Sequence, residues 1–395
     1  MAKTLVVGGD AHAPRVPFLR GILTRSLQDA GLSFDDAYAL ASSVRDELAE
    51  TSEISTDELH NAVLKRLSER FGGAIVQRYE APASGTMTVL VRDAKGQATP
   101  FSREQHRRHL ESSGLTYEQS AAVTSKLFDH LMKSAKREIS WRHLGSLTYR
   151  YLHQAVGSQA ARRFLVLVDF YRGKRPIILL IGGTPGCGKS EVATEVAHRL
   201  EIARTQSTDL LREVMRQMIP ERLLPVLHTS SFNAWWALPT RTRSEDDPEA
   251  LLVDGYRAQA DLLSVPCEAV IRRTLQEGTS LVLEGVHVQQ ELVSRIPKDS
   301  DAVVVFVMLA VLSPERLRER IARRGNEAHQ RRAERYLENF EQIWRLQSYL
   351  LSEADRWHVP IVLNHNREQV IRDLMKTVVD RLLIDFSAAP QEVFL

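Results

Sequence analysis

Short apolar runs alternate with amphipathic segments along the second half of the chain. Between the runs, apolar positions recur at the three- and four-residue spacing of a helix. Strands that alternate with helices predict an α/β fold, in which helices cover both faces of a parallel sheet and the ligand binds at the carboxyl ends of the strands. The predicted strands are Ile177–Ile181, a short one near Ala203–Ser207, Ser280–Leu283, Val303–Leu309 and Ile361–Leu363.

The first half of the chain contains an internal repeat. Pro17-Phe18 recurs as Pro100-Phe101, and Gly31-Leu32 recurs as Gly114-Leu115, at a constant offset of 83 residues. Further matches continue to about residue 164 after a two-residue shift. Each copy is expected to hold a short strand or hairpin followed by about four short helices.

Local signals give the expected boundaries within this repeat. Gly31 and Gly114 are predicted helix stops, and Ser55 and Ser140 are predicted helix N-caps. The Pro82-Ala-Ser-Gly85 stretch is the expected joint between the copies. The predicted domains are therefore residues 1–84, 85–170 and 171–395.

The most specific chemical signal follows the first predicted strand of the second half. Residues 183–190, Gly-Thr-Pro-Gly-Cys-Gly-Lys-Ser, match the phosphate-binding pattern G-x-x-x-x-G-K-[ST] between a strand and a helix. Glycines allow backbone N–H groups to turn toward phosphate oxygens, Lys189 is expected to reach the β- and γ-phosphates, and Ser190 is expected to ligate Mg²⁺. ATP and Mg²⁺ are the expected cofactors. The expected nucleotide-binding residues are Gly183, Thr184, Gly186, Cys187, Gly188, Lys189 and Ser190.

Charged residues follow two other predicted strands. Asp209, Arg212 and Arg216 lie three and four residues apart, on one face of a helix. Asp209 is a candidate base for a substrate hydroxyl and the two arginines a candidate anion fork, although a helix N-cap and solvated arginines would give the same pattern. Glu284 ends its strand and is a candidate catalytic carboxylate. His287 is a candidate substrate ligand or a packed core histidine.

Arginines are dense between Arg316 and Arg335. Segments of this kind close over phosphates in small-molecule kinases and neutralise charge in the transition state. Arg323 and Arg324 precede a Gly-Asn break and are the candidate catalytic arginines. Interleaved glutamates favour a solvated helix for others in the run.

Composition limits the class of protein. The 52 Lys and Arg residues nearly balance the 50 Asp and Glu residues, so a nucleic-acid-binding protein is not expected. Two cysteines, one of them inside the phosphate loop, favour a reducing cytoplasm without disulfides. We find no signal for secretion or membrane insertion, so a cytoplasmic enzyme is expected, and oligomerisation stays open.

The turn Val91-Arg-Asp-Ala-Lys-Gly96, which leads into Pro100-Phe101, resembles that of the ATP-cone, a small regulatory nucleotide-binding module. The resemblance implies a regulatory nucleotide at the N-terminal half. The first copy is less similar, because its turn, Gly8-Gly-Asp-Ala-His12, lacks the basic residue that the family places before Asp-Gly. Helical modules that dock or mediate assembly are the alternative.

Taken together, these segments are similar to the 2-phosphoglycerate kinase family over nearly the whole chain. The resemblance implies transfer of the γ-phosphoryl of ATP to the 3-hydroxyl of 2-phosphoglycerate. Two alternatives remain open: a kinase for another acidic alcohol, such as glycerate, a sugar acid or an inositol phosphate, and a non-catalytic nucleotide-dependent regulator. The matching segments are Ile181–Ser190, Thr208–Arg216, His228–Ser231, Leu283–His287 and Arg335–Phe340.

Overall fold

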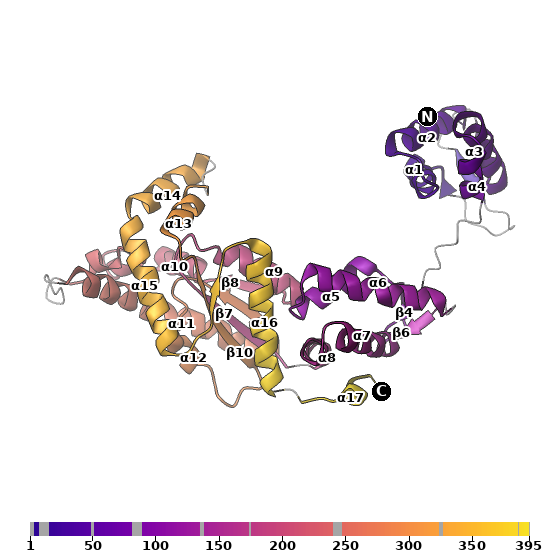
Figure 1. Ribbon diagram of the computed structural model, residues 1–395. Coiled ribbons are helices and arrows are strands. Elements are labelled where there is room, and N and C mark those ends of the chain that lie inside the picture. The colour runs from indigo at the N-terminus through magenta and orange to yellow at the C-terminus, as the bar shows by residue number, and fades with distance from the viewer. Residues whose placement is uncertain are drawn as a thin grey trace. The chain divides into compact units, whose positions relative to one another are not determined.

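The computed structural model describes residues 4–7, 16–48, 51–80, 89–134, 138–173, 175–239, 247–323, 327–385 and 387–394 (Figure 1). The chain divides into two units, Met1–Val89 and Leu90–Leu395. The second unit contains both the second copy of the repeat and the α/β half. The three-part division into residues 1–84, 85–170 and 171–395 therefore stays a prediction.

The first unit combines a small sheet with four helices among its described residues. Its strands β1 (Leu5–Val7), β2 (Val16–Pro17) and β3 (Glu53–Ser55) pair in the order β2-β1-β3. Leu27, Leu40 and Leu67 are completely buried in its core because they occupy the inward faces of amphipathic helices. The helices are α1 (Arg20–Asp29), α2 (Phe34–Glu47), α3 (Thr56–Phe71) and α4 (Gly73–Glu80).

The second copy repeats this order of elements within the described part of the second unit. Its strands pair in the order β5-β4-β6, with β4 antiparallel to β5 and parallel to β6, as β1 is to β2 and β3. The sequence analysis did not predict the third strand of either copy. The elements are β4 (Leu90–Arg92), β5 (Ala98–Pro100), α5 (Arg103–Ser112), α6 (Tyr117–Lys133), β6 (Glu138–Ser140), α7 (Trp141–Ala155) and α8 (Ser158–Arg172).

The predicted helix ends are confirmed. The Ser55 hydroxyl accepts a hydrogen bond from the backbone N–H of Glu58, and the Glu58 carboxylate accepts one from the backbone N–H of Ser55. Ser140 caps α7 by accepting a single hydrogen bond from the backbone N–H of His143. Gly31 and Gly114 have φ of +102° and +89°, the left-handed backbone that ends a helix. The turn at residues 8–12 and the joint at residues 82–85 lie outside the described residues.

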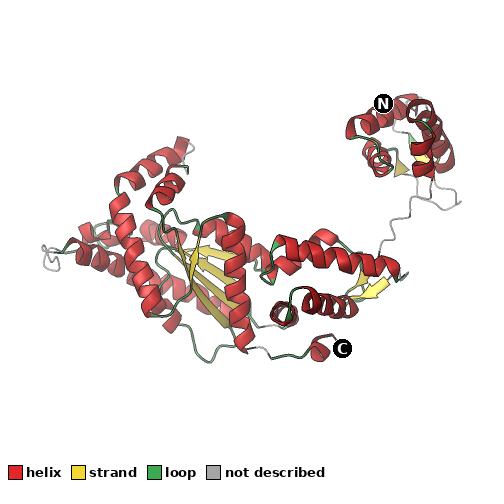
Figure 2. Cartoon of the chain, viewed as in Figure 1, coloured by secondary structure: helices red, strands yellow, loops and turns green. Residues whose placement is uncertain are grey.

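The carboxyl-terminal half is the predicted parallel sheet covered by helices. Every strand predicted there is present, and the described residues form a five-stranded sheet in the order β11-β10-β7-β9-β8 (Figure 2). Parallel pairing places all carboxyl ends at one edge of the sheet, which is where the site is expected. The strands are β7 (Ile177–Gly182), β8 (Arg204–Ser207), β9 (Leu281–Glu284), β10 (Val303–Ala310) and β11 (Ile361–Leu363).

Helices bury both faces of this sheet because alternate residues of β7 point to opposite sides. Leu179 packs among residues of α9 (Lys189–Arg199) and α16 (Arg367–Asp385). Leu180 packs among residues of α11 (Pro248–Gln276) and α12 (Gln290–Ser294). No helix within the described residues has a stretch that is long and apolar enough to cross a membrane. Both cysteines are described and buried, and no disulfide joins them.

The second copy of the repeat packs directly against the α/β half. Arg163 of α8 binds Asp380 of α16 through two hydrogen bonds of 2.8 and 3.2 Å. The Tyr171 hydroxyl donates to the backbone oxygen of Arg199, at the end of α9. The C-terminal helix α17 (Pro390–Phe394) packs on α7 and α8. The second copy therefore contacts the helix that follows the phosphate loop.

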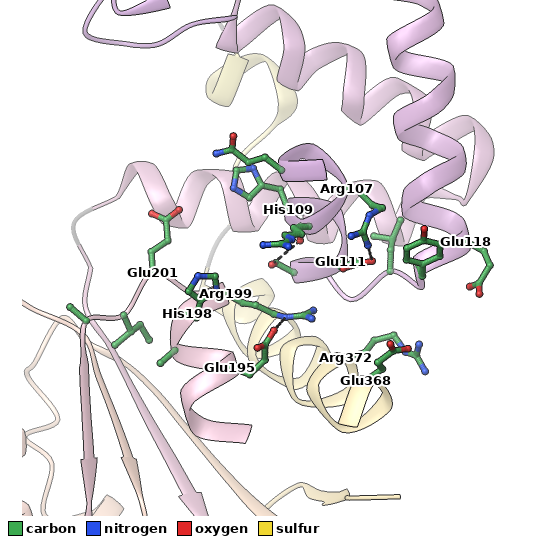
Figure 3. A pocket seen from close by; sticks show the side chains of 18 residues that line it. Arg107, His109, Glu111, Glu118, Glu195, His198, Arg199, Glu201, Glu368 and Arg372 are labelled. Atoms are coloured by element: carbon green, nitrogen blue, oxygen red, sulfur yellow. Dashed lines mark hydrogen bonds and ion pairs between the residues drawn. The ribbon is translucent and has the colours of Figure 1, made fainter. Parts of the chain in front are cut away.

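A cavity of about 1090 Å³ lies along this contact (Figure 3). Arg107 and Glu111 of α5 pair with each other on one side, and Arg199 and Glu195 of α9 pair on the other. Arg372 of α16 also lines it. The cavity lies toward the end of α9 that is remote from the phosphate loop, so it is not the catalytic cleft.

We predict that Ser55→Ala weakens α3 by about 1 kcal/mol, because a Ser N-cap with its capping box satisfies two backbone N–H groups. Hydrogen exchange of the full chain should show α3 amides exchanging about fivefold faster. Ser52→Ala is the matched control, since this exposed side chain caps no helix. Equal exchange in the two variants would contradict the assigned cap.

Candidate active site

The phosphate loop is shaped by three glycines that have no room for a side chain. Gly183, Gly186 and Gly188 have φ of +142°, +88° and +90°. A Cβ on Gly183 would lie 2.5 Å from the Leu309 backbone oxygen, and one on Gly186 would lie 2.7 Å from Ile321. The loop is therefore pressed against β10 and the helix α13 (Pro314–Ala322), with Gly188 as the N-cap of α9. This is the local structure that the motif predicts.

Lys189 lies at the start of α9 and is only 8% exposed. Its ammonium donates a 2.9 Å hydrogen bond to the backbone oxygen of Thr184. Thr184 is fully buried and is in turn held by the amide of Gln347. One hydrogen of the ammonium is thus committed to the loop, and a buried cation with further donors suits a bound phosphate.

Ser190, in the first turn of α9, contacts Glu284, at the end of β9. The Ser190 hydroxyl donates a 2.8 Å hydrogen bond to Oε1 of Glu284, which is 5% exposed at the end of β9. Within the described residues no group of three or more His, Cys, Asp or Glu side chains could form a metal cage. Mg²⁺ needs no such cage at a nucleotide, because phosphates and water supply most of its ligands. A hydroxyl beside a buried carboxylate fits that ion.

Arg320 and Asn364 complete the nucleotide side of the site, and the sequence analysis singled out neither. Asn364 follows β11 and donates a 2.8 Å hydrogen bond to the Cys187 backbone oxygen. The Arg320 guanidinium binds both the backbone and the side-chain oxygen of Asn364. A Cβ on Gly188 would lie 3.2 Å from Arg320 Nη1. Arg320 therefore lies beside the loop, where a guanidinium can neutralise phosphate charge.

The acceptor side is built on the helix α10 (Thr208–Met218). Ser207 caps this helix by accepting from the Asp209 N–H, so Asp209 is not the N-cap and its exposed carboxylate is available for chemistry. Arg212 donates a 2.8 Å bond to the Thr229 backbone oxygen. Arg216 instead pairs with Glu213 on its own helix. Of the two arginines in the predicted fork, Arg212 is the better placed.

His287 is buried, and both of its ring nitrogens are occupied by protein groups. Nε2 lies 2.8 Å from the Gln259 side-chain oxygen, and Nδ1 lies 3.1 Å from the Thr208 hydroxyl. The Gln259 amide nitrogen donates to the backbone oxygens of Val226 and Thr229, which leaves its oxygen to accept from His287 Nε2–H. Direct contact of His287 with substrate stays a prediction, and its geometry favours a positioning role.

Burial also fixes the charge of His287. Desolvation lowers its pKa to about 3, the nearby Asp209 carboxylate opposes this, and Arg212 and Lys189 add to it. The histidine is therefore neutral at physiological pH. Asp209, Arg212 and Lys189 each lie close enough to His287 to affect its pKa. Residues of the phosphate loop and of α10 therefore both lie near His287, at the carboxyl edge of the sheet.

The predicted arginine pair is only partly described. Arg323 follows α13, and its side chain is 81% exposed beside Glu319. Arg324 lies outside the described residues. A catalytic role for either one stays a prediction. Of the arginines in this run, Arg320 and Arg335 make the contacts to the site that the structure describes.

Comparisons with known proteins agree with this geometry. A family model described as an AAA domain matches residues 179–343. A 2-phosphoglycerate kinase from Pyrococcus furiosus is 32% identical to this chain over 74% of its length and 93% of the relative. Another from Methanocaldococcus jannaschii is 31% identical, over 78% of this chain and 97% of the relative. The chain belongs to the 2-phosphoglycerate kinase family. It is a phosphotransferase of the phosphate-loop class that uses ATP, which favours an enzyme over the non-catalytic regulator.

We predict that Lys189→Ala abolishes phosphoryl transfer and leaves the fold intact, because its side chain makes one described hydrogen bond to the protein. The loss should be on the order of 10³-fold or more, as expected for a lysine that stabilises charge on the transferred phosphoryl. Turnover by the purified variant is the measurement, with circular dichroism as the folding control. An active variant would remove Lys189 from the catalytic set.

A second prediction concerns pH. The folded-state pKa of His287, about 3, lies below the value of about 6.5 for an exposed histidine, so the unfolded state binds the proton first as pH falls. The contribution of the neutral histidine to the free energy of unfolding is fully present above pH 6.5. It falls as pH drops below that value, by about 1.4 kcal/mol per pH unit.

His287→Gln should therefore flatten the pH dependence of unfolding between about pH 6 and pH 4. All five tryptophans lie in the second unit, so their fluorescence during denaturation reports on that unit alone. His153→Gln, at an exposed position on α7, is the matched control. Parallel pH curves for His287→Gln and the wild type would contradict the buried neutral histidine.

Proposed function

We propose that this protein transfers the γ-phosphoryl group of ATP to the 3-hydroxyl of 2-phosphoglycerate and forms 2,3-bisphosphoglycerate and ADP. The observation that carries the proposal is the meeting of two sets of residues at the carboxyl edge of the sheet. Lys189, Ser190 and Glu284 form the nucleotide side, and Asp209 and Arg212 form the acceptor side. The name shared by the relatives supplies the acceptor.

On the nucleotide side, backbone N–H groups of the loop and the Lys189 ammonium would bind the phosphates. Ser190 and Glu284 would hold Mg²⁺, directly or through water, and the ion would neutralise charge between the β- and γ-phosphates. Arg320 would add a positive charge on the side of α13. These groups are largely fixed by hydrogen bonds within the protein, which favours electrostatic preorganisation.

On the acceptor side, Asp209 would orient the 3-hydroxyl and accept its proton. The hydroxyl oxygen then forms a bond to the γ-phosphorus while the bond from that phosphorus to the β–γ bridging oxygen breaks, so ADP leaves with the bridging electron pair. Arg212 would bind an anionic group of the acceptor. Asp209 is exposed and uncommitted to a helix cap, which suits both orientation and proton transfer.

The N-terminal half supports a regulatory proposal. In the second copy, the Arg92 guanidinium donates two hydrogen bonds to the Glu138 carboxylate and one to the Gly96 backbone oxygen. These bonds hold the turn that resembles an ATP-cone against β6. This copy contacts α9 through Tyr171 and α16 through Arg163. Binding of a nucleotide there would change the affinity of the phosphate loop for ATP through those helices. A coupling free energy of about 1–3 kcal/mol is typical of such linkage.

The direct test of the proposed function is ADP release with a panel of acceptors. The panel contains 2-phosphoglycerate, glycerate, a sugar acid and an inositol phosphate, which covers the alternative acceptors. We predict that 2-phosphoglycerate stimulates ADP release the most and that ATP alone turns over slowly. A larger response to another acid would keep the kinase and replace its acceptor.

Asp209→Asn should lower kcat by about 10²- to 10⁴-fold and leave ATP binding nearly unchanged, because the amide keeps the shape of the side chain but accepts no proton. Glu213→Gln on the same helix is the matched control, since its carboxylate pairs with Arg216. A collapse of ATP affinity in Asp209→Asn would instead assign Asp209 to the nucleotide or metal.

A further inference from the structure

Two arginines from different helices converge on one short segment, Thr229–Ser230. Arg212 of α10 donates a 2.8 Å bond to the Thr229 backbone oxygen. Arg335 of α14 (Glu327–Glu338) donates to the hydroxyl of Ser230, which is 8% exposed. These anchors are on adjacent residues, although the arginines are more than one hundred residues apart in the chain. The two guanidinium groups therefore both bind this two-residue segment.

The segment is held firmly on both sides. Phe232 packs edge-to-face on Tyr336 with ring centroids 5.6 Å apart, and Asn233 donates a 2.9 Å bond to Asn339. On the other side, Gln259 bonds the Thr229 backbone oxygen and connects it to the buried His287. Both arginine anchors are thus fixed relative to the catalytic edge of the sheet.

Neither guanidinium has a negative partner among the residues that the structure describes. Their recorded acceptors are a backbone carbonyl and a hydroxyl, which are both neutral. The Nε of Arg212 is buried and has no hydrogen-bond partner there, and the buried side-chain oxygen of Asn233 also has none. Arg212 is half-buried and Arg335 is exposed, and two positive charges held on adjacent residues without a counter-charge repel each other. An anion bound between them would relieve that repulsion. Arg216 differs because Glu213 neutralises it.

We propose that Arg212 and Arg335 clamp the phosphate group that the acceptor already carries, one from each side of Thr229–Ser230. In the free protein the Ser230 hydroxyl holds Arg335 in position, and the phosphate replaces it as acceptor. Because Arg335 belongs to α14, binding of the acceptor phosphate also fixes that helix over the site. This inference rests on the proposed function and adds the residue that makes the site select a phosphorylated acid.

Steady-state kinetics of Arg335→Ala, Arg335→Lys and Ser230→Ala test the clamp. Arg335→Ala should raise the KM for 2-phosphoglycerate roughly 10- to 100-fold, the value of a charge-assisted fork, and leave the KM for ATP within about twofold. Arg335→Lys should recover part of the loss, because lysine keeps the charge but not the fork. Arg356→Ala is the matched control, since Arg356 is exposed at the far end of α15 (Phe340–Arg356).

Ser230→Ala separates the clamp from a purely structural contact. If the hydroxyl only holds Arg335 until the phosphate arrives, the KM for 2-phosphoglycerate should stay within about threefold of wild type. If the Arg335–Ser230 bond matters only for the fold, Ser230→Ala should reproduce the loss seen in Arg335→Ala. That result, or an unchanged acceptor KM in Arg335→Ala, would overturn the proposal.

Calorimetric titration of inorganic phosphate in the presence of saturating ADP keeps the two proposals distinguishable. Phosphate binding that weakens in Arg335→Ala, in a protein that transfers nothing to 2-phosphoglycerate, would retain the clamp and reject the proposed acceptor. Equal phosphate binding by wild type and Arg335→Ala would reject the clamp, even if 2-phosphoglycerate proves to be the substrate.

Discussion

The site depends on how closely the phosphate loop packs against its surroundings. Gly183 abuts β10, Gly186 abuts α13, and Gly188 abuts both Asn364 after β11 and Arg320. A side chain at any of the three would displace a strand end or a helix. The same packing that requires glycine also brings Arg320 to the loop and gives Asn364 its bond to Cys187. The nucleotide site and the packing of the sheet therefore depend on the same three glycines.

A second set of buried polar groups connects the two sides of the site. His287, at the carboxyl edge, is neutral and bonds Thr208 at the start of α10 and Gln259 of α11. Gln259 in turn bonds Thr229, which also receives Arg212. Such a network is satisfied in only one arrangement, so it fixes the position of the acceptor side relative to β9.

Signals that are local in the sequence predicted most of the fold. Strands such as Ile177–Ile181 are buried on both faces and appear as continuous apolar runs, and Ser55 and Ser140 cap helices through residues only three positions away. The strands β3 and β6 were missed because each has three residues and lies directly before a helix. The phosphate loop was predicted because its motif combines strand, turn and helix in one stretch.

Contacts over long sequence separations could not be predicted. Asn364 bonds Cys187 across 177 residues, and Gln347 bonds Thr184 across 163, and an isolated amide in the sequence carries no sign of its partner. The roles of Arg320 and Arg335 could not be distinguished from those of the other arginines between residues 316 and 335, because the local sequence around each is similar. Asp209 was an open choice between cap and catalyst until Ser207 proved to be the cap. His287 was placed at the site, but its inward hydrogen bonds follow only from the structure.

The central claim is that the γ-phosphoryl of ATP passes directly to the hydroxyl of the acceptor. Incubation with 2-phosphoglycerate and ATP that carries ¹⁸O on the three terminal γ-oxygens, followed by mass spectrometry, tests it most directly. The account predicts 2,3-bisphosphoglycerate with all three labelled oxygens on the new phosphoryl group and ADP in equal amount. Labelled inorganic phosphate, with 2-phosphoglycerate left unchanged, would contradict it.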